Sequence, residues 1–133
     1  MSNIFAKIFG ICATPLPLDG DCWEYWDGDL KIELSHASEL SSAGGALRFD
    51  GKGLPYGVLA FHGIDGEYHA FRNRCTHFGR KVDPVRGRRE IKCCSLGGST
   101  WNYQGKLISG LAKEDLKVLN LKKYAGELII KVD

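Results

Sequence analysis

The sequence lacks the features of an exported or membrane-spanning chain. Its apolar N-terminal stretch, MSNIFAKIFGIC, is interrupted by Lys7 and has no basic head of the kind found in secretory signals. It is also far shorter than the roughly 20 apolar residues that a transmembrane helix needs. We therefore expect no membrane span and a cytoplasmic location.

The chain also has little net charge and no repeat, low-complexity tract or interdomain linker. A net charge of +2 over 133 residues gives no general affinity for polyanions. A chain of this length forms one domain with a core that does not depend on disulfides. Its five cysteines are an odd number and come without an export signal, which favours metal or redox chemistry over a secreted disulfide framework.

The first 19 residues are expected to precede the domain, which spans 20–133. Ile4, Phe5, Ile8 and Ile11 are spaced as on one face of a short amphipathic helix. Such a helix would pack on its own domain or on a partner, and the spacing alone does not choose between them.

Beyond residue 20 the pattern is that of short strands and turns. DLKIEL alternates apolar and charged residues, which is the period of a half-buried strand. Three hairpins are predicted, around Asp65-Gly66, Gln104-Gly105 and Ala125-Gly126. A brief helix or irregular linker is expected between Ser35 and Gly45. The prediction is a small, all-β domain of antiparallel strands.

Two isolated histidines lie on either side of the first hairpin turn. His62 and His69 flank Asp65-Gly66, and we expect them to face each other across it. Neither has a second residue of ligand type at a metal-binding spacing, so no metal role is assigned to them.

Residues that can bind metal are concentrated in two short stretches. CTHFG places Cys75 and His77 two residues apart, where a turn of the backbone lets a thiolate and an imidazole face one site. KCCSLGGSTWN contains Cys93 and Cys94, the latter 19 residues after the first cysteine (94 minus 75). A lone C-x-H occurs by chance, but the pair of stretches is a much stronger signal.

Together these stretches resemble the ligand loops of Rieske-type [2Fe–2S] proteins. The family pattern is C-x-H-x-G and then C-x-x-H-G-S, followed by an aromatic residue and Asp or Asn. CTHFG matches the first loop completely. With Cys94 as the second cysteine, four residues fall where the family has them: Gly98, Ser99, Trp101 and Asn102. The later stretch GKLISGLA is similar to the family's G-P-A segment, with Leu111 in place of proline.

The resemblance implies a Rieske (ISP-like) fold with a cluster-binding loop subdomain. It also implies that Cys75 and Cys94 bind one iron of a [2Fe–2S] cluster and that His77 binds the other. Ser99 would donate a hydrogen bond toward a cluster sulfur or stabilise the turn. Ser99 and Trp101 would thus surround the ligands without binding metal.

The sequence departs from the family in two places. Gly97 stands where the second histidine ligand belongs, and Arg80 and Leu96 stand where the high-potential branch carries a disulfide. Four outcomes stay open for the missing ligand. In the first, Cys93 is a surrogate ligand, although adjacent strand residues point to opposite faces. In the second, water or a partner group completes the coordination of the iron. In the third, the site holds zinc bound by Cys75, His77, Cys93 and Cys94, and in the fourth it is empty.

Basic residues are frequent around both loops and suggest a partner. They are Arg72, Arg74, Arg80, Lys81, Arg86, Arg88, Arg89 and Lys92. Such a rim would steer a redox partner with an acidic docking face. RGRR at 86–89 lacks the stacking aromatics or recognition helix of a nucleic-acid site, so no nucleic acid is expected.

These observations favour an electron-transfer ferredoxin of Rieske type, or the small redox subunit of a larger enzyme. An electron carrier or redox subunit is favoured over a stand-alone enzyme, and an oxygenase formed by this chain alone is not expected, because 133 residues leave no second domain to hold a mononuclear catalytic iron. The alternative is a non-redox, protein-binding module on a Rieske fold, with a structural zinc or no metal.

Overall fold

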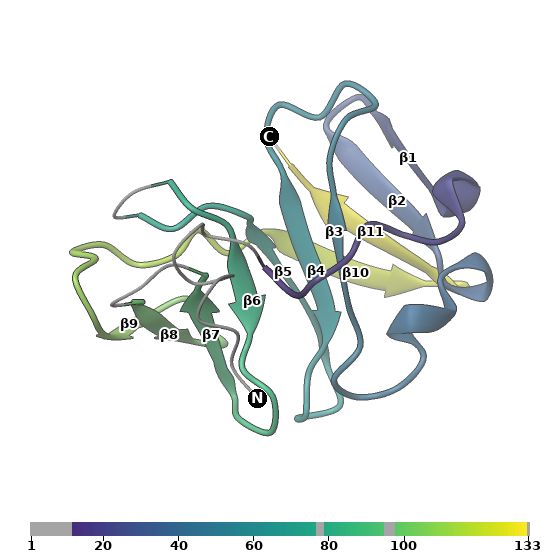
Figure 1. Cartoon of the computed structure of the whole chain (residues 1–133). Coiled ribbons are helices and arrows are strands. Elements are labelled where there is room, and N and C mark those ends of the chain that lie inside the picture. The colour runs from purple at the N-terminus through teal and green to yellow at the C-terminus, as the bar shows by residue number, and fades with distance from the viewer. Residues whose placement is uncertain (1–11, 77–78, 95–97, 133) are drawn as a thin grey trace.

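The described part of the chain is built almost entirely from β-strands. The computed structural model describes residues 12–76, 79–94 and 98–132, so the predicted N-terminal helix lies outside it. Within these residues the chain forms three antiparallel sheets and three short 3-10 helices (Figure 1). None of the described helices is long and apolar enough to span a bilayer. The all-β prediction is confirmed.

The first sheet, sheet A, consists of two hairpins joined edge to edge. Its strands, in spatial order, are β1 (Trp23–Trp26), β2 (Asp29–Glu33), β11 (Glu127–Lys131) and β10 (Asn120–Tyr124). The hairpins turn at Asp27-Gly28 and Ala125-Gly126, where all four residues have positive φ. Two-residue turns of this kind match the right-handed twist of the strands, so the turn residues fix the registers of both hairpins.

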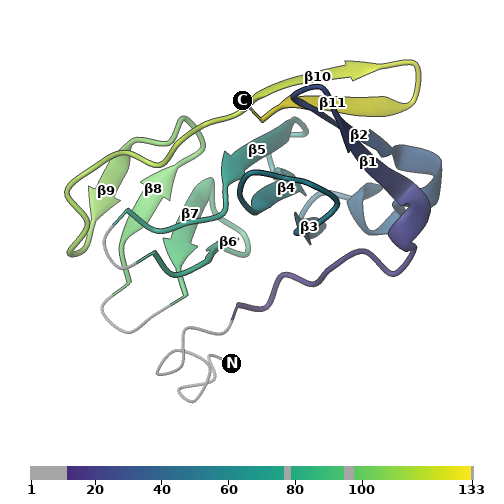
Figure 2. The ribbon, with the colours of Figure 1, turned by 90° about the horizontal axis from the view of Figure 1, so that it is seen from above.

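Sheet B lies in the middle of the molecule, between sheets A and C (Figure 2). It contains β3 (Ala46–Phe49), β4 (Val58–His62) and β5 (Tyr68–Arg72). Strand β4 is buried on both faces: Val58 and Ala60 join the core under sheet A, whereas Leu59 and Phe61 join the core under sheet C. Successive strand residues point to opposite faces, so one strand serves both cores.

Sheet C is smaller and carries the predicted ligand loops. Its strands are β6 (Val82–Pro84), β7 (Glu90–Cys93), β8 (Thr100–Asn102) and β9 (Leu107–Ser109). Trp101 and Ile91 are fully buried between this sheet and sheet B. The sheet therefore forms a separate layer at one side of the molecule (Figure 2).

The predicted local structure can be compared directly with these elements. The hairpins at Asp65-Gly66, Gln104-Gly105 and Ala125-Gly126 are confirmed. The segment expected to be a brief helix or linker contains the 3-10 helices η2 (Leu34–His36) and η3 (Ser38–Leu40), and a third, η1 (Gly20–Cys22), precedes β1.

The expected pairing of His62 with His69 is wrong. In the register of β4 and β5, His62 lies opposite Tyr68, and His69 lies opposite Phe61. The hairpin loop contains five residues, so positions at equal distances from Asp65-Gly66 do not pair. His69 Nε2 instead donates a 2.9 Å hydrogen bond to Oδ2 of Asp65.

Candidate metal centre

The two cysteine loops meet at sheet C, where the first leads from β5 into β6 and the second connects β7 to β8. The first is closed at its base by hydrogen bonds from Cys75 N to Arg80 O, 2.5 Å, and from Gly79 N to Cys75 O, 3.0 Å. The second is closed by a bond from Cys93 N to Ser99 O, 2.8 Å. A further bond, from Cys94 N to Lys81 O at 3.1 Å, joins one loop to the other. The adjacency that a shared site needs is therefore present in the backbone.

Two of the predicted ligand positions, His77 and Gly97, lie outside the described residues. A ligand role for His77 and the missing ligand at Gly97 therefore stay predictions. Cys75 is described and is 2% exposed. Its thiol belongs to the same buried cluster as Phe71 and Val82.

Adjacent positions Cys93 and Cys94 have different surroundings. Cys93 ends β7 opposite Val82 and is buried in the core under sheet C, with Ile91 and Trp101. Cys94 follows the strand and forms a disulfide with Cys12. This separation weighs against a shared site for the two sulfurs, as the alternation of strand side chains predicts. A surrogate role for Cys93 stays a prediction.

The Cys12–Cys94 disulfide links positions that are 82 residues apart in the sequence. Their Cα atoms are 5.4 Å apart, within the usual range for a disulfide. Cys94 is 5% exposed, and Cys12 is half-buried. Sequence reasoning missed Cys12 as a site residue because it lies far from both loop motifs and has no ligand-type neighbour.

Asp83 anchors the segment that follows Cys12. Its carboxylate accepts hydrogen bonds from Ala13 N at 2.8 Å, from Thr14 N at 3.2 Å and from Thr14 Oγ1 at 2.5 Å. Asp83 and Thr14 are both buried. Ligand atoms of Cys12, Asp83 and Cys94 lie within 4.8 Å of one another. Because three donors already occupy the carboxylate, Asp83 acts in this arrangement as an anchor for the chain.

Ser99 and Trp101 connect the second loop to the segment that follows β9. Ser99 Oγ accepts a hydrogen bond from Ala112 N at 2.8 Å, and Trp101 Nε1 donates to Glu114 O at 3.0 Å. Gly110 has φ of +106°, and a Cβ there would lie 2.3 Å from Ser99 Cα. The close approach therefore requires glycine. Since Ser99 accepts here, its own hydroxyl proton is left for the predicted bond toward a cluster sulfur.

The first loop is tied to the same segment. Thr76 Oγ1 donates to Glu114 O at 3.0 Å, the oxygen that also accepts from Trp101. One carbonyl thus joins the first loop, strand β8 and residues 110–116. A shallow pocket beside Cys75 is lined on its other sides by charged residues, which are Arg72, Arg74, Glu114, Asp115 and Lys117.

The structure divides the basic residues that the sequence analysis placed together. Strands β6 and β7 pair antiparallel, with Val82 opposite Cys93 and Pro84 opposite Ile91. Residues 85–89, which include the RGRR stretch, therefore lie at the far end of this hairpin from the cysteine loops. Of the predicted group, Arg72, Arg74, Arg80 and Lys81 lie at the first loop, where Lys117 joins them, whereas Lys92 lines a different pocket.

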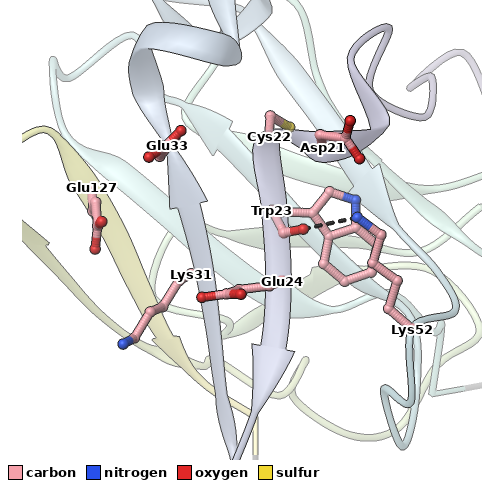
Figure 3. A pocket seen from close by; sticks show the side chains of 8 residues that line it. All are labelled: Asp21, Cys22, Trp23, Glu24, Lys31, Glu33, Lys52 and Glu127. Atoms are coloured by element: carbon pink, nitrogen blue, oxygen red, sulfur yellow. Dashed lines mark hydrogen bonds between the residues drawn. The ribbon is translucent and has the colours of Figure 1, made fainter.

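A second pocket, on the opposite side of the molecule, contains a cysteine of a different kind. Figure 3 shows charged side chains of both signs around Cys22 and Trp23, with Lys52 Nζ hydrogen-bonded to Trp23 O at 2.8 Å. Burial raises the pKa of the Cys22 thiol, as do the carboxylates of Asp19 and Glu39, against the opposing effect of Lys52. The thiol is thus held in its protonated, unreactive form.

The donors at the loops match part of what a [2Fe–2S] cluster requires. Buried cysteines at positions 75 and 94, at the bases of joined loops, suit an iron bound by two thiolates. Cys94 offers a thiolate only when its bond to Cys12 is reduced, because a disulfide sulfur is not a thiolate. The described residues therefore fit the cluster in the dithiol form and not in the disulfide form.

The fold and the loops define a class: small antiparallel β domains that carry two cysteine-containing loops at one end. The Rieske [2Fe-2S] domain family matches residues 31–124, well over half of the chain. The chain therefore belongs to the Rieske [2Fe–2S] domain family, and the family implies a [2Fe–2S] cluster. No curated protein matches the chain in sequence.

Solved structures with the same fold include a Rieske protein, a ferredoxin and a monooxygenase. The plasma membrane Rieske protein PetC3 of Synechocystis PCC 6803 is 24% identical, with 65% of this chain and 86% of that chain covered and a TM-score of 0.55. The ferredoxin of carbazole 1,9a-dioxygenase from Nocardioides aromaticivorans IC177 is 17% identical, with 71% and 93% covered and a TM-score of 0.58.

A third similar structure is much longer than this chain. It is a quaternary ammonium Rieske monooxygenase described from gut microbiota, 20% identical, with a TM-score of 0.58. The match covers 98% of this chain but 32% of the monooxygenase. At these identities the three likenesses show the fold alone.

Proposed function

We propose that this domain is an electron-transfer protein of Rieske type, either a ferredoxin or the small redox subunit of a larger enzyme, with an atypical ligand set. The observation that carries the proposal is the joining of two loops, each with a buried cysteine at its base, by the bond from Cys94 N to Lys81 O. A cluster bound there would accept and return an electron.

The residues of the chain have separate parts in this function. Cys75 and Cys94 would hold one iron as thiolates, and His77 would bind the other. Ser99 lies at the base of the second loop, where its hydroxyl would donate toward a cluster sulfur and raise the potential. Residues 110–116, anchored at Ser99 and Trp101, would keep water from the inner side of the site.

The partner in this proposal is a redox protein with an acidic docking face. Arg74, Arg80 and Lys81 are exposed beside the first loop, so their field would orient an acidic protein toward the cluster. One similar structure is the ferredoxin of a dioxygenase, and an oxygenase component is accordingly the class of partner that we favour.

A cytoplasmic location is part of the proposal. Cytosolic glutathione and thioredoxin keep thiols reduced, and Cys94 must be reduced to serve as a ligand. Fractionation of cells that express the full chain would test the location, and recovery in an oxidising compartment would contradict it.

Reconstitution of the full chain tests the function. After reduction, the protein is incubated anaerobically with ferrous iron and sulfide, and bound iron, acid-labile sulfide and visible absorbance are measured. We expect a coloured protein with iron and sulfide in equal amounts. Cys75→Ala should abolish binding, whereas Cys22→Ala, the matched control on a buried cysteine of the other core, should not.

Gly97→His provides a gain-of-function arm in the same assay. If this position lacks a ligand, the added imidazole should increase cluster occupancy and lifetime. Cys93→Ala tests whether Cys93 is a surrogate ligand. If it is, the variant should lose metal in the wild-type background but should keep its metal when Gly97→His is also present. Iron binding that survives Cys75→Ala would overturn the proposed site.

A second candidate function has one specific observation in its favour. The disulfide to Cys12 occupies Cys94, which suits a metal-free module that recognises a partner protein, or a zinc site that excludes Cys94. A reduced protein that stays colourless, or that takes up stoichiometric zinc in competition with iron and sulfide, would support this alternative.

A further inference from the structure

The pairing of Cys12 with Cys94 brings an unassigned cysteine to a predicted ligand. Cys12 lies outside the region that matches the Rieske family, residues 31–124, whereas Cys94 lies inside it. The contact therefore joins the region that matches the family to a segment outside it. Nothing in either loop motif requires it.

Both partners are positioned independently of the bond between them. On one side, Cys94 N donates to Lys81 O and Cys93 N donates to Ser99 O, which fixes the base of the second loop. On the other side, Ala13 and Thr14 are held by the Asp83 carboxylate. Strand β6 carries Asp83 directly beside β7, so the anchor and the target cysteine belong to one hairpin.

The anchored segment continues along sheet B. Arg48 N donates to Pro15 O at 2.9 Å, and Arg48 Nε donates to Thr14 O at 3.2 Å. Contacts on three successive residues after Cys12 thus hold the segment in one course. None of these contacts involves a cysteine sulfur, so we expect them to persist after reduction and to keep the two thiols within reach of each other.

We propose that Cys12 and Cys94 form a reversible thiol–disulfide site whose oxidation removes Cys94 from the cluster ligand set. The second half of this inference rests on the proposed function, in which Cys94 binds iron. The first half, reversible pairing, does not. Oxidation and metal binding compete for the same sulfur, so each state excludes the other.

The chemistry requires a small disulfide such as oxidised glutathione. Cys12 is the more exposed partner, so its thiolate attacks one sulfur of the small disulfide and releases a glutathione thiolate. The Cys94 thiolate then attacks the Cys12 sulfur of the mixed disulfide and releases the second glutathione. Two electrons pass from the protein dithiol to the small disulfide, the two protons lost by the protein thiols are taken up by the two departing glutathione thiolates, and a dithiol reductant reverses the exchange.

The first experiment measures the pairing without metal. The full chain is equilibrated anaerobically in glutathione buffers of graded potential, alkylated and digested without reduction, and the peptides are analysed by mass spectrometry. We expect one cross-linked peptide pair, Cys12 with Cys94, and a disulfide-to-dithiol ratio that changes about tenfold for each 30 mV, as for a two-electron couple. Absence of this pair in oxidised protein would overturn the inference.

The second experiment measures exclusion of the cluster. Wild-type protein, Cys12→Ala and Cys22→Ala are each oxidised or reduced and then reconstituted with iron and sulfide. Oxidised wild type and oxidised Cys22→Ala should bind little iron, whereas Cys12→Ala should bind equally in both states. If Cys12→Ala also loses the cluster when reduced, Cys12 is a ligand and the exclusion mechanism is wrong.

Failure of the proposed function can be told apart from failure of this inference. If no reduced variant binds a cluster although the Cys12–Cys94 peptide forms reversibly, the proposed function is wrong. The exclusion of the cluster is then wrong too, whereas the reversible pairing stands. If reduced variants bind a cluster but no such peptide forms, the proposed function stands and the thiol–disulfide site is overturned.

Discussion

The core under sheet A and the core under sheet C are held together in different ways. Sheet A pairs strands of four and five residues in continuous registers through two-residue turns, over an aliphatic interior that includes Leu30, Ile32 and Ile130. Sheet C has strands of three and four residues, with an irregular register between Thr100 and Trp101. Because its strands are short, many backbone N–H and C=O groups around this sheet must form hydrogen bonds outside the strand pairs.

Side chains supply those contacts around sheet C. Asn73 Oδ1 accepts from Val82 N at 2.9 Å, Ser99 Oγ accepts from Ala112 N, and Asp83 holds Ala13 and Thr14. All three of these polar residues are buried. The difference indicates that the sheet A side is a scaffold set by apolar packing, whereas the sheet C side is a set of loops positioned by polar contacts near the cysteines.

The largest expected effect on stability comes from truncating a buried side chain in the core under sheet A. Leu30 is fully buried and pairs across the sheet with Tyr25 and Ile130. Leu30→Ala should lower the free energy of unfolding by about 2–5 kcal/mol, from lost burial and the cavity left behind. Ile108→Ala, on the exposed side of β9, should change it by less than about 0.5 kcal/mol. Denaturant titration measures both, and equal effects would contradict the contrast.

The next effect tests the polar side of the comparison. Asp83→Ala leaves Thr14 Oγ1 and two backbone N–H groups without their acceptor, which should cost about 1–3 kcal/mol. It should also shift the glutathione equilibrium of Cys12 and Cys94 toward the dithiol, because the segment is no longer held beside Cys94. Glu33→Ala is the control, since Glu33 is an exposed carboxylate on sheet A beside His36, away from the Cys12 segment. An unchanged equilibrium in Asp83→Ala would show that the anchor does not position Cys12.

The scaffold is also the part that the sequence predicted well. Alternating apolar residues and turn pairs such as Ala125-Gly126 act locally, so the hairpins follow from a few neighbouring residues. The first and second ligand loops were found in the same way, because Cys75 and Cys94 lie within short motifs.

What the sequence did not reveal depends on contacts distant along the chain. Cys12 meets Cys94 across 82 positions, and no motif in the sequence marks Asp83 as the residue that anchors the Cys12 segment. The grouping of basic residues failed for a related reason. Arg86 and Arg88 are close to Lys81 in sequence, but the β6–β7 hairpin carries them to its other end.

A smaller effect, dependent on pH, is expected at the hairpin that joins both cores. Burial opposes ionisation of Asp65, but hydrogen bonds from Glu67 N and His69, with the charges of His69 and Arg89, hold the pKa of its carboxyl below the ordinary value. The folded-state pKa is lowered, so the stabilisation is present above the unfolded value of about 4 and is lost as pH falls through the folded value.

Asp65→Asn should therefore destabilise the protein by about 1 kcal/mol near neutral pH, the usual worth of one hydrogen bond. The difference from wild type should shrink below about pH 4. Thermal or denaturant unfolding across this range measures it. A difference that stays constant down to the lowest pH at which the fold survives would show that the carboxylate charge has no part in it.

The smallest effect is expected at the cysteine of the scaffold core. Cys22 is 1% exposed, and burial together with nearby Asp19 and Glu39 raises its pKa. In reduced, folded protein a thiol reagent should therefore modify Cys12 well before Cys22, because the thiolate is the reactive form. Cys22→Ala should leave the glutathione equilibrium of Cys12 and Cys94 within about twofold of wild type, since distant sites act independently. Rapid labelling of Cys22 in the folded state, or a shifted equilibrium in the variant, would mean that the two cores are coupled and that the contrast between scaffold and loops does not hold.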